Sequence, residues 1–114
     1  MRLPAKGVLL RIIIGEALRY DGVPLYEWIV VQARKSGVAG ATVYRGMMGY
    51  GANSRIKTSS IFRLSEDLPV IVELVDSREV LESFFAEIER VISEGVVTME
   101  ELDIQMYRHN KEKM

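Results

Sequence analysis

Apolar and polar residues follow two different periods along this chain, and the two periods predict six secondary-structure elements. Four segments are rich in β-branched residues or alternate between apolar and polar positions, which is typical of strands. Two segments carry an apolar residue at every third or fourth position, which is typical of helices that bury one face. We therefore expect strands at 8–14, 41–44, 70–75 and 96–107, and helices at 24–36 and between Asp76 and Gly95.

Residues that favour chain ends set the boundaries of the two helices. Pro24 suits the first position of the earlier helix, where its missing N–H costs nothing, and Gly37 suits the C-terminal end. Asp76 is expected to cap the later helix and Gly95 to close it. Asp21-Gly22, ahead of the first helix, predicts a turn.

The order of these elements, βαββαβ, predicts an α+β fold of the ferredoxin-like class. A four-stranded antiparallel sheet would carry both helices on one face, with a long loop at about 51–67 between the second and third strands. We expect residues 1–114 to form this single domain, with a frayed tail at about 109–114. The expected helix-facing residues of the sheet are Val8, Leu10, Ile12, Ile14, Val70, Val72, Leu74, Leu102, Ile104 and Met106.

The opposite face of the sheet is expected to combine an apolar centre with charges of both signs. Such a surface is typical of a subunit interface, so we expect an oligomer. The alternative is that the long loop of the same chain covers this face. The expected residues are Leu9, Ile13, Tyr44, Ile71 and Val75, together with Arg11, Glu73, Glu101 and Asp103.

Composition narrows the class of protein. The chain has 114 residues, of which 48% are hydrophobic, enough for a core of its own. It contains no cysteine, which excludes disulfide and thiolate chemistry. The apolar run at 7–14 is short and broken by Arg11, so we expect a strand there rather than a signal peptide. No stretch approaches membrane-spanning length, and a cytoplasmic location is expected.

Positive charge is concentrated in the middle third of the chain, although the net charge of the whole is −1. No acidic residue lies between Glu27 and Glu66. A basic segment without carboxylates is a candidate for binding anions. The alternative is an ordinary solvated surface loop without a ligand. The basic residues in this interval are Arg34, Lys35, Arg45, Arg55, Lys57 and Arg63.

Three glycines at the start of the loop, Gly46, Gly49 and Gly51, strengthen the prediction of an anion site. Glycine lets the backbone approach a ligand closely, and consecutive N–H groups in a turn can bind an anion. Arginine and lysine side chains would pair with phosphate oxygens. The candidates for this role in the middle third of the chain are Arg45, Arg55 and Lys57.

Catalysis, metal binding and nucleic-acid binding are disfavoured by the residues present. His109 is isolated near the end of the chain, and no nucleophile, base and orienting group can be assembled from the sequence. The His, Cys and carboxylate spacing of a metal site is also missing. An RNA-binding sheet needs exposed aromatic residues, and here Tyr44 and Tyr107 would lie beside carboxylates that repel phosphate. We therefore expect neither an enzyme nor a nucleic-acid-binding protein.

Three short motifs resemble those of the PII signal-transduction proteins. Gly49-Tyr50-Gly51 is similar to the Gly-Phe-Gly that opens the long loop of PII proteins, and Glu66-Asp67-Leu68-Pro69 to the Asp-Phe-Leu-Pro that closes it. Val72-Glu73-Leu74-Val75 is similar to the Ile-Glu-Ile-Val of the following strand. The run at 40–46 looks like the smaller PII-like family, the uncharacterised relatives of these proteins.

The resemblance implies a homotrimer with its sheets turned inward and an adenine nucleotide (ADP, ATP or AMP) in the clefts between subunits. No cofactor would be tightly bound. The long loop would contact a protein target, for example a membrane transporter or channel. Taken together with the residue-based candidates, the expected nucleotide-binding residues are Arg45, Gly46, Gly49, Tyr50, Gly51, Asn53, Arg55, Lys57 and Arg108.

The chain also departs from the PII pattern. PII proteins have a second glycine-rich phosphate loop ending in lysine before the last strand, and here residues 93–98 lack that lysine and most of the glycines. Asn53 stands at best where PII proteins have a glutamine that assists metal and 2-oxoglutarate binding. A trimer that binds no nucleotide, with a structural or ion-tolerance role, is therefore kept as the alternative function.

Overall fold

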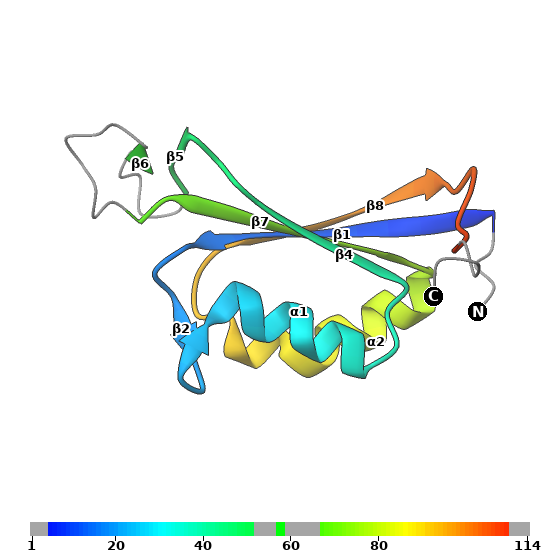
Figure 1. Ribbon diagram of the computed structural model, residues 1–114, viewed down its shortest axis with the longest axis horizontal. Coiled ribbons are helices and arrows are strands. Elements are labelled where there is room, and N and C mark those ends of the chain that lie inside the picture. The colour runs from blue at the N-terminus through cyan, green and yellow to red at the C-terminus, as the bar shows by residue number, and fades with distance from the viewer. Residues whose placement is uncertain (1–4, 52–56, 59–66, 110–114) are drawn as a thin grey trace.

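The computed structural model describes residues 5–51, 57–58 and 67–109. Its main elements follow the expected order and form one layer of strands and one of helices (Figure 1). They are β1 (Lys6–Gly15), α1 (Leu25–Lys35), β4 (Gly40–Arg45), β7 (Pro69–Asp76), α2 (Arg78–Ile88) with the 3-10 turn η2 (Glu89–Val91), and β8 (Val96–Asp103). Two short hairpins are added to these, β2 (Arg19–Tyr20) with β3 (Val23–Pro24) and β5 (Met48–Gly49) with β6 (Lys57–Thr58).

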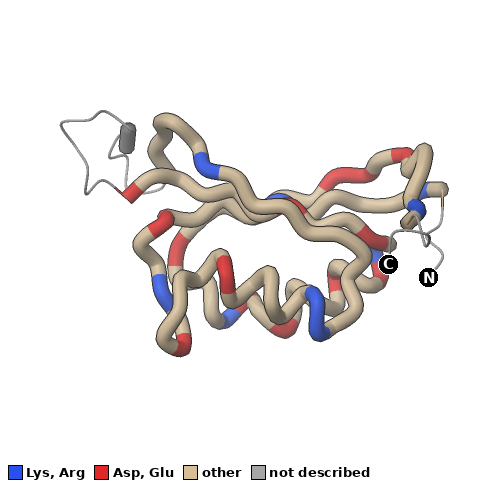
Figure 2. The backbone as a smooth tube through the Cα atoms, viewed as in Figure 1, with Lys and Arg blue, Asp and Glu red and all other residues tan. Residues whose placement is uncertain are grey.

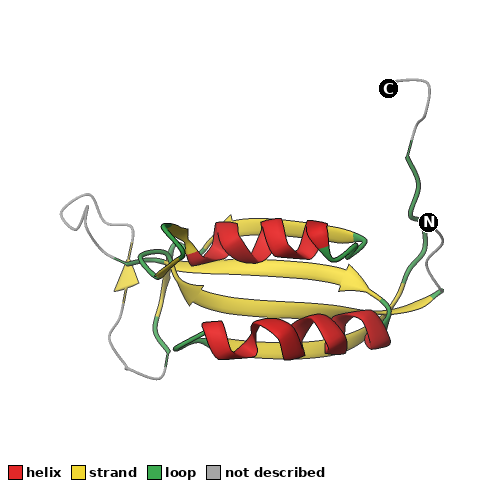
Figure 3. Ribbon diagram, turned by 90° about the horizontal axis from the view of Figure 1, so that it is seen from below, coloured by secondary structure: helices red, strands yellow, loops and turns green. Residues whose placement is uncertain are grey.

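The four long strands form one antiparallel sheet in the order β4-β7-β1-β8, so β1 and β7 are central. Both helices cover the same face of this sheet, as Figures 1 and 3 show. This arrangement confirms the ferredoxin-like α+β fold. The β5–β6 hairpin lies at one end of the sheet, and β1 begins and β8 ends at the other (Figure 1).

The hydrophobic core lies between the sheet and the helices. Alternate residues of β1 and β7 are buried because successive side chains of a strand point to opposite faces. Each helix contributes residues three or four positions apart, as the pattern predicts. The central core residues are Val8, Leu10, Ile12, Ile14, Leu25, Ile29, Ala33, Val72, Leu74, Leu81, Phe84 and Ile88.

The expected faces of the last strand were wrong. Leu102 lies opposite Gly7 and so on the outer face of the sheet, whereas Val97 and Met99 face the helices. β8 ends at Asp103, before the expected end at 107, so Ile104 and Met106 lie beyond it. The same register puts Glu101 and Asp103, expected on the outer face, on the side of the sheet that carries the helices.

Ile104 has a structural role of its own beside the start of β1. Its backbone N–H donates to the carbonyl of Ala5 at 2.7 Å. A Cβ on Gly7 would lie 2.5 Å from the Ile104 side chain, so the glycine makes room for it. The chain after β8 is thereby attached to the first strand.

The N-terminal end of α2 also differs from the prediction. Ser77, not Asp76, is the N-cap, and its hydroxyl accepts a hydrogen bond from the N–H of Val80 at 3.2 Å. α2 ends at Ile88, well before Gly95, which instead lies in the connection to β8. Asp76 is 4% exposed and accepts from the N–H of Ala39 at 2.9 Å and from that of Ser77. It joins the end of β7 to the segment before β4.

Replacing Asp76 with alanine is expected to lower the free energy of unfolding by about 1–3 kcal/mol, because two backbone N–H groups lose their buried acceptor. Urea denaturation measures this change. Asp103→Ala is the matched control: its ion pair with Lys6 is exposed and contributes at most about 1 kcal/mol. Equal effects of the two substitutions would contradict the structural role of Asp76.

Candidate functional site

The segments before and after the long loop are bonded to each other, and the second is also bonded to the turn that follows β1. Gly46, shortly before the loop, donates its N–H to the carbonyl of Pro69 at 2.8 Å. Leu68 accepts from the N–H of Glu16 at 2.8 Å, and the Asp67 carboxylate accepts from the N–H of Ala17. These three bonds give the Asp-Leu-Pro sequence a physical role. They hold the start and the end of the loop at one place on the sheet.

Two glycines allow the close contacts at this end of the sheet. A Cβ on Gly15 would collide with the carboxylate of Asp67, which lies against the end of β1. Gly95 has a φ of 144°, and a Cβ there would lie 2.6 Å from the carbonyl oxygen of Ile13. Glycine is needed where backbone segments approach this closely. The connection before β8 is therefore held tightly against β1.

A cavity of about 380 Å³ lies beside these contacts. It is bordered by the end of β1, the starts of β7 and β8, and the glycine-rich segment that leads into the loop. Its described lining consists of Ile13, Ile14, Gly15, Gly46, Met48, Gly49, Tyr50, Gly51, Asp67, Pro69, Ile71, Glu94, Gly95 and Val96.

Three lining residues form a row across the outer face of the sheet. Ile13 of β1 lies directly opposite Ile71 of β7 on one side and Val96 of β8 on the other. Side chains opposite each other in an antiparallel pair share a face and lie in contact distance. We call Ile71, Ile13 and Val96 the apolar row. It gives the cavity one apolar wall.

Charge in the described lining is negative. Asp67 and Glu94 carry carboxylates, and no lysine, arginine or histidine is among the lining residues that the structure describes. Figure 2 accordingly shows acidic positions at the end of the sheet from which the loop extends. This part of the site thus differs from the expected basic anion site.

The structure brings together four of the expected site residues, Gly46, Gly49, Tyr50 and Gly51, which all line the cavity. Lys57 lies in β6, where its backbone pairs with that of Gly49. Asn53 and Arg55 lie outside the described residues.

The two remaining candidates lie elsewhere in the chain. Arg45 is opposite Val70, so its side chain is on the helix-facing side of the sheet, where it forms an ion pair with Glu16. Arg108 follows Tyr107, whose hydroxyl donates to the carbonyl of Ala39 at 2.8 Å. That contact lies just before β4 begins, at the opposite end of this strand from the cavity. Within one chain, neither arginine lines the cavity.

Sequence reasoning did not select Glu94, Gly95, Val96 or the two isoleucines of the apolar row as site residues. The segment at 93–98 stood out only for the lysine and glycines that it lacks. The sequence feature that could have pointed to these residues is the position of the segment at the junction of the second helix and the last strand. Its proximity to Gly49 depends on the pairing of β8 with β1, which residue types alone do not give.

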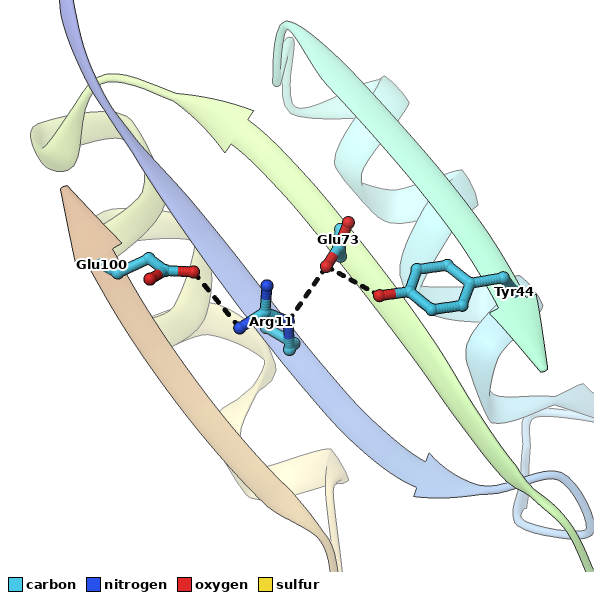
Figure 4. A network of polar contacts seen from close by, with 4 residues as sticks. All are labelled: Arg11, Tyr44, Glu73 and Glu100. Atoms are coloured by element: carbon cyan, nitrogen blue, oxygen red, sulfur yellow. Dashed lines mark hydrogen bonds and ion pairs between the residues drawn. The ribbon is translucent and has the colours of Figure 1, made fainter. Parts of the chain in front are cut away.

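A polar network crosses the outer face next to the apolar row (Figure 4). Glu73 Oε2 accepts from Arg11 Nε and from the Tyr44 hydroxyl, each at 2.9 Å. Arg11 also forms an ion pair with Glu100 at 3.2 Å. The expected mixture of charged and apolar residues on this face is therefore present, with Glu100 in place of Glu101 and Asp103.

The network changes the ionisation of two of its members. The hydrogen bond to Glu73 raises the pKa of Tyr44 above its ordinary value of 10.0. The hydrogen bond to the same carboxylate is the largest cause that raises the pKa of Arg11. Both groups thus keep their protons more firmly in the folded protein, because deprotonation would remove a bond to an anionic acceptor.

In residues 5–51, 57–58 and 67–109, no three His, Cys, Asp or Glu side chains form a group that could hold a metal ion. No helix within the same ranges is both long enough and apolar enough to cross a membrane.

Most of this chain matches the model of a known protein family. The model of DUF190, described as "Uncharacterized ACR, COG1993", matches residues 7–104. This chain belongs to the DUF190 family. A UPF0166 protein of Aquifex aeolicus (strain VF5) is 35% identical to the DUF190 chain over 99 residues, which cover 87% of the chain and 93% of that protein.

Solved structures show that the DUF190 chain has the fold of PII-like proteins. CPII from Thiomonas intermedia K12, bound to ADP and bicarbonate, superposes with a TM-score of 0.67 at 16% identity, covering 89% of this chain and 90% of CPII. A PII-like signalling protein from Thermus thermophilus gives a TM-score of 0.56 at 18% identity, covering 88% of each chain. These likenesses confirm the resemblance to the PII-like proteins.

Tyr44 is expected to ionise at a pH above about 10 in the folded protein, as the difference in phenolate absorbance between the wild type and Tyr44→Phe would measure. The bond to Glu73 should stabilise the fold fully below the unfolded-state pKa of about 10 and lose this effect as the pH rises through the higher folded-state pKa. The wild type in denaturant is the control. A Tyr44 midpoint at or below that of the denatured protein would contradict the network.

Proposed function

We propose that this protein is a PII-like regulatory protein that binds an adenine nucleotide (ADP, ATP or AMP) at the base of its long loop. The observation that carries this proposal is the cavity where the loop joins the sheet. Its lining includes Gly46, Gly49 and Gly51 before the loop and Asp67 and Pro69 after it. A ligand in this position touches both ends of the loop and can change its order or orientation.

The ligand class is supported by proteins of the same fold. CPII, the structural neighbour described above, was solved with ADP and bicarbonate and also with ADP, AMP and bicarbonate. Sequence identity is 16%, so the likeness supports the nucleotide proposal through the fold rather than through shared residues. The cavity volume of about 380 Å³ fits the range of small-molecule sites.

We further propose a homotrimer with the outer sheet faces turned inward. In a single chain Leu9, Ile13, Ile71 and Val75 are only partly buried on this face. Other copies would cover these side chains and remove apolar surface from water. They would also turn the cavity, which borders the same face, into a cleft between subunits.

The output of such a trimer would be a contact with a protein target through the long loop, in the cytoplasm and without catalysis. A membrane transporter or channel is the kind of target that the family resemblance implies. Nucleic acid is a poor ligand for the outer face. The Tyr44 hydroxyl is bonded to Glu73 there, and Glu100 adds a second carboxylate.

Calorimetric titration with ADP, ATP and AMP, combined with light scattering, tests the proposal. We expect saturable binding near one nucleotide per subunit and the molar mass of a trimer. A trimer that binds none of the three would contradict nucleotide binding and favour the structural alternative. A monomer would contradict the proposed interface.

A pair of matched substitutions tests whether the cavity is the binding site. Val96→Trp should fill the cavity and reduce nucleotide affinity at least about tenfold, a loss of about 1.4 kcal/mol. Val31→Trp is the control, because Val31 lies on α1 away from the cavity and is 44% exposed, against 46% for Val96. Unchanged affinity in a folded Val96→Trp protein of unchanged molar mass would place the nucleotide elsewhere.

A further inference from the structure

The charge of the described cavity lining is unfavourable for a nucleotide's phosphates. The described lining carries the carboxylates of Asp67 and Glu94 and has no cationic side chain. A phosphate group within this space would lie near two like charges in partly desolvated surroundings, where repulsion is stronger than in water. The uncharged part of a nucleotide fits these surroundings better than the phosphate chain.

The shape and polarity of the cavity also favour the uncharged part of the nucleotide, its base and sugar. The apolar row offers an apolar wall against which a purine base can lie. Tyr50 and Met48, which are both largely exposed in the single chain, add apolar surface near the loop. The volume of about 380 Å³ is at the lower end of the range of small-molecule sites, about 300–1,000 Å³, which suits a base with its sugar.

The two carboxylates differ in their surroundings. Asp67 accepts from the N–H of Ala17 and lies against Gly15, so it has a structural role. Glu94 is exposed and directly precedes Gly95, whose backbone is held against Ile13. The close contact at Gly95 fixes where Glu94 enters the cavity wall. A carboxylate at the edge of a nucleotide site is suited to accept hydrogen bonds from ribose hydroxyls.

We propose that the cavity binds the ribonucleoside part of the ligand, with Glu94 accepting hydrogen bonds from the ribose, and that the phosphates remain outside the cavity. This inference rests on the proposed function and narrows it, since it names the part of the nucleotide that is recognised. Adenosine itself is then a ligand. The number of phosphates has little influence on affinity.

Titration of the wild-type protein with adenosine, AMP, ADP, ATP and 2′-deoxyadenosine tests this proposal. We expect dissociation constants for the first four that agree within about tenfold, whereas one charge-assisted contact to phosphate would change affinity by about 10- to 100-fold. 2′-Deoxyadenosine should bind about tenfold more weakly than adenosine because it lacks one hydroxyl that donates to the carboxylate.

Glu94→Gln tests the role of the carboxylate, since glutamine keeps the size of the side chain and removes its charge. Adenosine affinity should fall about tenfold. ATP affinity should fall less, because the loss of repulsion offsets the loss of the hydrogen bond, so the ratio of ATP affinity to adenosine affinity rises. Glu89→Gln is the matched control on exposed η2, outside the cavity lining, and should change neither affinity.

The outcomes separate this inference from the proposed function. If ADP or ATP binds and adenosine does not, recognition through the nucleoside is wrong and the nucleotide function stands. If none of the ligands binds, both proposals are wrong. If adenosine binds equally to the wild type and to Glu94→Gln, the cavity can bind a nucleoside but the assignment of Glu94 is overturned.

Discussion

The antiparallel register of β1 between β7 and β8 is the constraint on which both faces of the sheet depend. It directs Ile12 and Ile14 into the core and Ile13 to the outer face. A shift of one residue would exchange these sets and expose the core side chains. Core packing therefore fixes the outer face as well. The alignment of Ile13 with Ile71 and Val96, the apolar row, follows from the same register.

The second constraint is the hydrogen bonding of the segments that flank the long loop. The carbonyls of Leu68 and Pro69 and the side chain of Asp67 bind backbone N–H groups of Glu16, Gly46 and Ala17, respectively. The segment that leads into the loop is thus joined to the segment that leaves it, and the latter is joined to the turn after β1, beside the cavity. A ligand held between these segments can act on the loop without a change in the core. In the proposed function, the sheet positions the ligand, and the loop contacts the protein target in a way that depends on whether the ligand is bound.

The sequence predicted the regular parts of this fold well for identifiable reasons. β1 and β7 are mostly apolar, with one charged residue inside each (Arg11 and Glu73), and both helices have clear periodicity, so the type of each element follows from its hydrophobic pattern. β8 is different because Val97 and Met99 are out of phase with Leu102. Only its pairing with β1 decides which set faces the helices.

The location of the candidate site could be predicted from residues that shape the backbone. The side chains that line it could not, because the direction of each depends on strand register. The glycines at 46, 49 and 51 indicated a site at the loop base, and a cavity lies there. The face of the sheet to which Arg45 points depends on the register of β4 with β7. The position of Arg108 depends on where β8 ends. Glu94 was missed because a search for a basic anion site does not select a carboxylate.

A crystal structure of the protein grown with ADP would show both where the nucleotide binds and how it is oriented. The expected arrangement has adenine against Ile13, Ile71 and Val96, the ribose beside Glu94, and phosphates directed out of the cavity. ADP bound away from the apolar row, or with its phosphates inside the cavity and its base outside, would contradict it.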